Sequence, residues 1–349
     1  METTSGTLDE ALQRLHASGP EFKGFLSNHG PMAIEAMVRN GQARTVHRWL
    51  DTYEHKLEDV PVAKAPLTDA NWQQALGETD RVTDWTAYFT ERVAERPWRD
   101  VLAEWWPRLL PGIAGAATHP VIRLGHAVRT LLTEGESAPR LAEFAHALGY
   151  WAARHLPLPT AVHPTGRATP AEALAAVPRI ADQRVAPVQG YAQLPDTEGW
   201  LTTTESLHLP EDPEAVREGL TALVRAATLN YGDYGHGNGI MLVHAATAPN
   251  AVLRILPALP QDLWAPSFTV AWAATSAITA IYAADTPRRA PDAGSLTPEE
   301  VFARAIANGN EHAIKFADTA LDVAAASEDG DTRALSAALN AVALIDVDD

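Results

Sequence analysis

Apolar residues recur at three- and four-residue intervals along most of the chain. The spacing is clear in residues 101–110 (VLAEWWPRLL), 141–156 (LAEFAHALGYWAARHL) and 301–326 (VFARAIANGNEHAIKFADTALDVAAA), and it places apolar side chains on one face of a helix. Thr169 and Thr297 each precede a proline and stand three residues before a glutamate, which is typical of a capped helix start. No alternating strand pattern is flanked by Asn-Gly or Asp-Gly turns. The sequence therefore predicts an all-α protein.

Residues 155–170 (HLPLPTAVHPTGRATP) are rich in proline and turn residues and interrupt the helical pattern. The helical patterns on either side of this region do not look like complete domains by themselves. A chain of 349 residues can bury a substantial core. We therefore expect one large helical domain over residues 1–349, with 155–170 as an internal loop.

The charge and the residue composition restrict which molecules the protein can bind. A formal net charge of -17 repels nucleic acid and anionic membranes, so we expect no nucleic-acid and no membrane partner. The N-terminus lacks a basic region followed by an apolar run, and no apolar stretch of about 18 residues is apparent. We expect a cytoplasmic protein. With no cysteine in the chain, any metal site must use histidine, carboxylate or a modified side chain.

Several catalytic motifs are missing from the sequence. No G-x-G-x-x-G follows a strand and no P-loop is present, so no motif supports a bound NADPH or flavin. No G-x-S-x-G elbow identifies a hydrolase nucleophile.

Four of the histidines stand apart from the others. His29 and His119 lie at predicted helix entries, close before prolines, whereas His244 and His312 are embedded in apolar helical runs. A buried imidazole needs a hydrogen bond or a metal, because burial without a partner is costly. Each of the four alone is more often a hydrogen-bonded core residue, but together they favour a metal centre.

Lys315 is the only lysine after Lys64 and lies three residues after His312 in an apolar run. A buried lysine amine can lose its proton and attack a carbonyl or CO2, which an arginine cannot do. The alternative is a lysine whose alkyl chain is covered and whose amine reaches water.

Five short blocks occur together in an order and wording that resemble the questin oxidase-like family. They are FLSNHGPMAIEAM, THPVIRLGHAVR, HALGYWAARHLPLP, HAATAPNAVLRILP and EHAIKFADTAL. The resemblance covers nearly the whole chain and implies an all-α oxygenase that oxidises or opens the quinone ring of anthraquinone-type polyketides. The family's namesake activity is a Baeyer–Villiger oxidation with NADPH, whereas one branch uses non-haem iron held by histidines and a carboxylated lysine.

The resemblance implies His29, His119, His244, His312 and Lys315 as metal ligands. His312 and Lys315 share a helix face, and a carbamate on Lys315 would be an anionic oxygen donor. The resemblance points to Fe2+, but imidazole and carboxylate ligands also suit Zn, Mn and Ni. The expected partners are an aromatic polyketide and O2.

His126 and Arg123 are the expected catalytic residues. His126 lies seven residues after His119, on the same helical face, where it either replaces His312 as a ligand or contacts substrate. Arg123 would hold a substrate oxyanion, although a salt bridge is the simpler role.

Three functions remain open at this point. The leading one is a metal-dependent oxygenase of an aromatic polyketide. The others are a metal-free monooxygenase that uses dissociable NADPH, and a non-catalytic helical protein that binds an aromatic ligand. The sequence leaves the substrate, the metal and the oligomeric state undetermined.

Overall fold

A computed structural model describes residues 4–327 and 330–346. Within these residues the chain is overwhelmingly helical, and its strands are two short segments that form one hairpin. The predicted all-α class is confirmed. The helices form two compact units, which consist of residues 1–157 with 254–260 and residues 158–253 with 261–349. The prediction that they make one domain stays a prediction.

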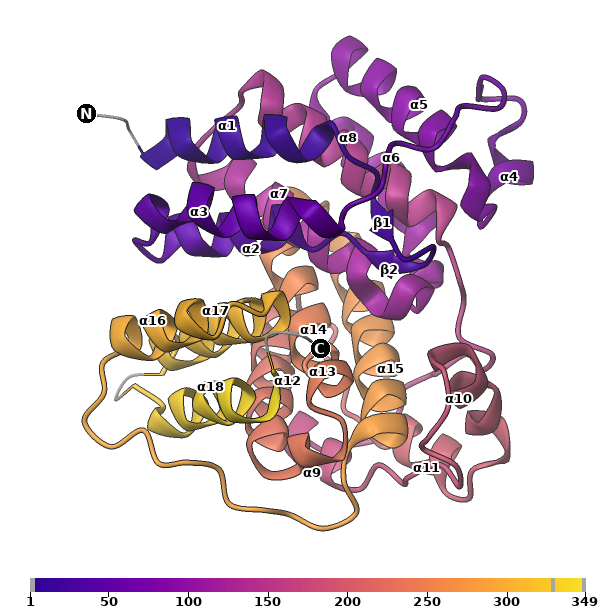
Figure 1. The fold of residues 1–349 in the computed structure, drawn as a ribbon. Helices are drawn as coiled ribbons and strands as arrows, with labels where there is room; N and C mark the ends of the chain where they lie inside the picture. Colours follow the sequence, from indigo (N-terminus) through magenta and orange to yellow (C-terminus); the bar gives the residue numbers. More distant parts are fainter. Residues whose placement is uncertain (1–3, 328–329, 347–349) are drawn as a thin grey trace. The chain divides into compact units, whose positions relative to one another are not determined.

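The first unit contains the N-terminal helices and the hairpin (Figure 1). Its elements are α1 (Thr4–His16), β1 (Glu21–Phe22), β2 (Leu26–Ser27), α2 (Gly30–Arg39), η1 (Ala43–Thr45), α3 (Val46–Tyr53), η2 (Glu54–Lys56), α4 (Trp72–Ala75), η3 (Thr79–Arg81), α5 (Val82–Glu95), α6 (Trp98–Leu109), η4 (Leu110–Gly112), η5 (Gly115–Thr118), α7 (His119–Thr133), α8 (Ala138–Ala153) and η8 (Leu256–Ala258).

Helix α8 is central to the packing of this unit, because α1, α5, α6 and α7 all contact it. Helix α2 packs against α1, α3 and α7, and Figure 1 shows α1, α2 and α3 side by side. The aromatic rings of Trp85, Phe89 and Trp105 are fully buried and contact one another, so these residues fill the core. This packing brings the start of α2 to the start of α7.

The second unit contains most of the C-terminal half. Its elements are α9 (Pro170–Ala175), α10 (Pro187–Gln193), η6 (Leu194–Asp196), α11 (Trp200–Glu205), α12 (Pro213–Tyr234), η7 (Gly235–Gly237), α13 (Gly239–Leu242), α14 (His244–Ile255, whose last two residues belong to the first unit), η9 (Gln261–Leu263), α15 (Trp264–Tyr282), α16 (Pro298–Asn308), α17 (Glu311–Ala325) and α18 (Thr332–Leu344).

Helix α12 contacts α15, α17 and α18, and α16, α17 and α18 pack together, as Figure 1 shows for the yellow helices. Thr169 and Thr297 form the predicted capping boxes at the starts of α9 and α16. Residues 155–169 are irregular, as predicted, and α9 begins at Pro170.

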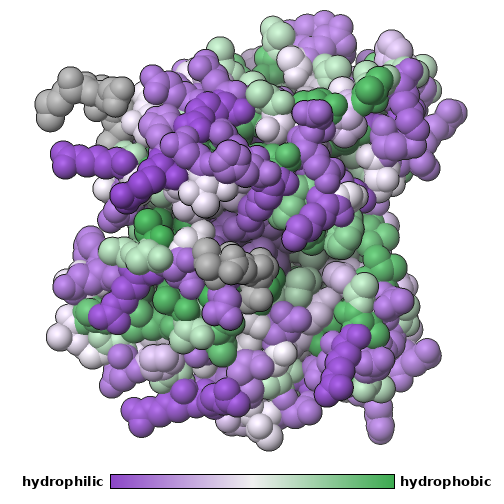
Figure 2. All heavy atoms as spheres, viewed as in Figure 1, coloured by the Kyte–Doolittle hydropathy of each residue, from purple (hydrophilic) through white to green (hydrophobic). Residues whose placement is uncertain are grey.

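Hydrophilic residues cover most of the face drawn in Figure 2, with apolar residues in separate patches. One helical stretch of the described residues, 239–258, is apolar and long enough to span a membrane by length and composition, with a mean hydropathy of 1.3. The expectation that no such stretch exists was wrong. Because 72% of its 18-residue window is buried inside the protein, the stretch has the burial of a core helix, and it is weak evidence for a membrane.

Candidate metal centre

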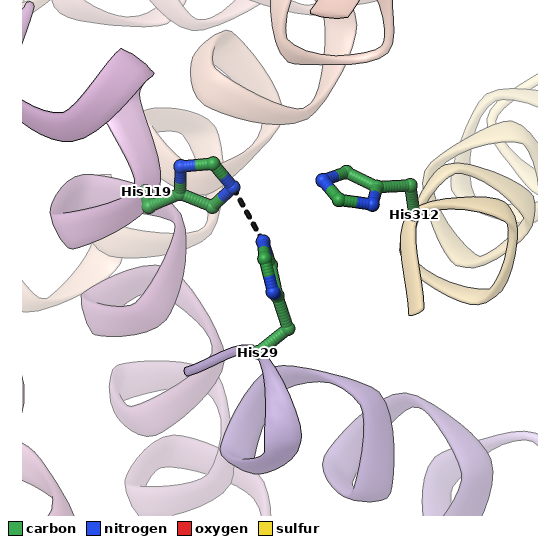
Figure 3. Close-up of side chains that lie close together, drawn as sticks. All are labelled: His29, His119 and His312. Carbon is green, nitrogen blue, oxygen red and sulfur yellow. Dashed lines mark hydrogen bonds between the residues drawn. The ribbon is translucent and has the colours of Figure 1, made fainter. Parts of the chain in front are cut away.

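His29 and His119 form a buried pair in the first unit. His29 immediately precedes α2, and its backbone N–H donates to the Tyr53 hydroxyl at 2.6 Å. His119 is the first residue of α7. Their Nε2 atoms face each other at 2.6 Å, as the dashed line in Figure 3 shows, and the exposed fractions are only 3% and 7%. The packing of α2 on α7 therefore brings together two predicted ligands that are 90 positions apart.

The protonation of His119 follows from its second ring nitrogen. Nδ1 lies 2.6 Å from the carbonyl oxygen of Ala116. A carbonyl can only accept a hydrogen bond, so Nδ1 carries the proton, and in the neutral ring Nε2 presents a lone pair. His29 Nε2–H therefore donates to this lone pair.

His244 and His312 lie together in the second unit, with ring centroids 5.5 Å apart. His244 begins α14, and its Nδ1 donates to the carbonyl of Met241 at 3.0 Å. His312 lies in the first turn of α17, and its Nδ1 donates to Asn310 Oδ1 at 3.2 Å. In its neutral form each of these rings therefore also presents the Nε2 lone pair. Figure 3 shows the His312 ring extending from its helix.

Burial keeps His244 neutral. Its side chain is completely enclosed, and burial, followed by the nearby Lys315, lowers the pKa of His244 to about 3. A neutral imidazole is the form that binds a metal.

Lys315 is also completely buried, on α17. Its Nζ has no hydrogen-bond partner within the residues that the structure describes. Burial lowers the pKa of Lys315 to about 7, although Glu311 acts in the opposite direction. A substantial fraction of this amine is therefore unprotonated at neutral pH and can act as a nucleophile. The alternative role, an amine that reaches water, is not what the structure shows.

His126 lies on α7, as His119 does, but its Nδ1 contacts a carboxylate. Its Nδ1 lies 2.6 Å from Glu35 Oε2, and Arg129 donates from two nitrogens to the same carboxylate. Burial opposes the ionisation of Glu35, but Arg129 and His126 outweigh it and lower its pKa to about 2. Burial also lowers the pKa of His126, so its ring is neutral.

Arg123 is engaged in a second buried ion pair. Its Nε and Nη2 donate to the two oxygens of Glu143 at 2.6 and 2.7 Å. His16 Nε2 also lies 2.9 Å from Glu143. These contacts satisfy Arg123 through a carboxylate, which is the simpler of its two expected roles. The catalytic roles of Arg123 and His126 stay predictions.

The carboxylates Glu35 and Glu143 and the cap Asn310 were not anticipated from the sequence. The chain has 44 acidic residues, and nothing in the local sequence separates Glu35 and Glu143 from the rest. Asn310 carries a recognisable signal, because an asparagine two residues before a histidine at a helix start can cap the helix and bind the ring.

The donor groups fit a divalent metal. His119, His244 and His312 each fix their Nδ1–H on an oxygen, as metal-binding histidines usually do. The Nε2 atoms of His29 and His119 face each other, so these two residues would hold the ion through nitrogen donors. Glu35 fits less well, because Arg129 and His126 already occupy both of its oxygens. The prediction that all five expected ligands bind one ion stays a prediction.

Comparison with known proteins agrees with the resemblance found in the sequence. A family model described as questin oxidase-like matches residues 26–320, which include all five expected ligands. No curated protein matches the chain significantly.

Proposed function

The chain belongs to the questin oxidase-like family, and on this premise we propose that it is an oxygenase that acts on a polycyclic aromatic polyketide at a non-haem metal. The substrate is an anthraquinone or a related hydroxyquinone, and the reaction is a Baeyer–Villiger-type or ring-cleaving oxidation. The family supports the reaction class, and the histidine groups support the metal.

One observation carries the metal proposal. His119, His244 and His312 each donate Nδ1–H to an oxygen two or three residues earlier in the chain. This arrangement leaves three buried, unprotonated Nε2 atoms. A single buried histidine needs such a hydrogen bond in any core, but three that share this orientation have the arrangement that metal-binding histidines usually show.

Lys315 supplies the fifth proposed ligand. Its unprotonated amine attacks CO2, forming an N–C bond and releasing one proton, and the product is a carbamate with an anionic oxygen. This change removes the unsatisfied buried amine and supplies negative charge to balance a divalent cation. A bound Fe2+ would supply the activation of O2. The oxygens of Ala116, Met241 and Asn310 would keep the proton of each proposed histidine ligand on Nδ1.

The first experiment measures the metal. Purified protein is analysed for bound metals and then reloaded with Fe2+ without oxygen. We expect one divalent ion per chain and O2 consumption in the presence of a hydroxyanthraquinone. H119A and H244A should each lose the whole metal content. A protein that retains no metal and instead oxidises NADPH with a quinone would contradict the proposal.

The second experiment tests Lys315. K315A should lose metal and turnover, and K315R should recover neither, because guanidinium stays charged and cannot form a carbamate. Formate or another small carboxylate should partly restore K315A by supplying an oxygen donor.

The matched control is K64R, at an exposed lysine, where the change in stability should stay within about 0.5 kcal/mol. Full metal content in K315R would show that Lys315 is not a ligand.

A further inference from the structure

The turn before α7 has an unusual backbone. Ala116, Ala117 and Thr118 have φ values of 43, 52 and 70°, in the left-handed region that non-glycine residues avoid. Lys23 is the one other non-glycine residue with positive φ in the described part of the chain. Thr118 is β-branched, so its conformation is especially unfavourable. Three such residues in succession require strong support from their surroundings.

The support comes from the end of α8. A Cβ atom on Gly115 would lie 1.7 Å from the carbonyl oxygen of Arg154, and one on Gly112 would lie 2.1 Å from the His155 ring. Ile113 also pairs with Leu156 in a short bridge. The backbone before the turn is therefore pressed against residues 154–156, and the chain must reverse sharply to begin α7.

Thr118 carries a second unfavourable feature. Its side chain is fully buried, and its hydroxyl has no hydrogen-bond partner in the described residues. No side-chain hydrogen bond in the described residues offsets these costs, so the support comes from the packing against residues 154–156. Unfavourable backbone that the surrounding structure holds in place is concentrated at functional sites.

The strained turn ends on His119. The Ala116 carbonyl accepts both the backbone N–H and the Nδ1–H of His119. One oxygen therefore holds the residue at two points, while its Nε2 faces His29. His244 makes the same Nδ1 contact with Met241 from a helical backbone, so the tautomer alone does not require strain. The left-handed turn adds control of the ring's direction.

We infer that the left-handed turn Ala116–Thr118 is a positioning element, which holds the His119 ring in one tautomer and one direction toward His29. The role in metal binding rests on the proposed function, but the fixed ring is a property of the metal-free protein. A flexible turn in this place would let the ring rotate away from His29.

The test uses A117G, because glycine adopts left- and right-handed backbone with equal ease. The matched control is K23G, which relaxes the exposed left-handed residue of the hairpin turn in the same unit. Both variants should fold, because the changes remove only one methyl group and one exposed side chain. The readouts are the ¹⁵N chemical shifts of His119 in metal-free protein and the affinity for Zn2+ by calorimetry.

We expect K23G to match the wild type in both readouts. A117G should show a mixture of His119 ring states and bind Zn2+ about tenfold or more weakly, as is usual when support of a ligand is lost. Wild-type His119 chemical shifts together with wild-type Zn2+ affinity in A117G would overturn the inference. A wild type that binds no Zn2+ would count against the proposed function alone, because the ring states are read without metal.

Discussion

His146 is a histidine whose surroundings hold it neutral. Its ring lies 4.4 Å from that of His16, which contacts the buried pair of Glu143 and Arg123. Burial, together with the nearby charges of His16 and Arg123, lowers the pKa of His146 to about 3. Protons therefore bind this residue more readily in the unfolded chain than in the folded one.

This difference predicts acid sensitivity. Between the ordinary histidine pKa near 6.5 and about 3, the unfolded state holds one proton more at this position, so stability falls as pH falls. The loss approaches about 1.4 kcal/mol per pH unit in the middle of the range. H146Q should unfold with a shallower dependence on pH in urea titrations, and H55Q, at an exposed histidine, should keep the wild-type dependence. Equal slopes in all three proteins would contradict the assignment.

Single residues also show what could be read from the sequence. His29 and His119 were recognisable because a histidine beside a helix-opening proline has a fixed local geometry. Glu35 was not, because its partners His126 and Arg129 are 91 and 94 positions away and meet it only through the packing of α2 on α7. The local sequence therefore indicated the two candidate ligands, whereas the contacts of Glu35 depend on tertiary packing.

Asn310, the residue before helix α17, contacts both the start of the helix and the ring of His312. Asn310 Oδ1 accepts the backbone N–H of His312 at 2.8 Å and its Nδ1–H at 3.2 Å. The Asn310 amide also donates to the carbonyl of Asp346 at 2.8 Å. One side chain thus caps the helix and fixes the tautomer of a proposed ligand.

Replacing the cap should separate these two roles. N310A should lose about 1 kcal/mol from the missing cap and also weaken Zn2+ binding, because His312 becomes free to change tautomer. T297A removes the cap of α16 in the same unit and should lose similar stability with unchanged Zn2+ affinity. Thermal unfolding and calorimetry measure both. Equal Zn2+ affinity in the two variants would contradict the second role of Asn310.

The helices themselves were predictable where caps and apolar spacing coincide. Thr169 and Thr297 start α9 and α16 as expected. The left-handed turn at 116–118 was not, since alanine and threonine carry no preference for positive φ. Its conformation follows from contact with residues 154–156, which no local pattern reveals.

At the scale of the whole molecule, the first unit is not continuous in sequence. Residues 254–260 belong to it, and η8 packs against α6 with Leu256 fully buried. This return of the chain was not anticipated, because the sequence pattern of residues 244–257 looks like one uninterrupted helix.

A fragment of residues 1–157 should therefore be incomplete. Joining it to residues 254–260 through a flexible glycine-serine linker should raise its free energy of unfolding by about 1.5–3 kcal/mol, the value of burying one leucine. The comparison uses urea unfolding followed by circular dichroism, with a scrambled 254–260 segment as control. Equal stability of the authentic and scrambled fragments would show that the segment is dispensable.

The hydrogen bond from His244 to the Met241 carbonyl also makes the orientation of His244 sensitive to oxidation of Met241. The chain has no cysteine, and of the methionines in the described residues Met32 and Met37 are buried, whereas Met241 is partly exposed. Oxidants should therefore convert Met241 to its sulfoxide first. The added polar oxygen would disturb α13 and, through it, the carbonyl that orients His244. The proposed oxygenase would then lose activity during turnover with O2. Treatment with methionine sulfoxide reductase should restore that activity.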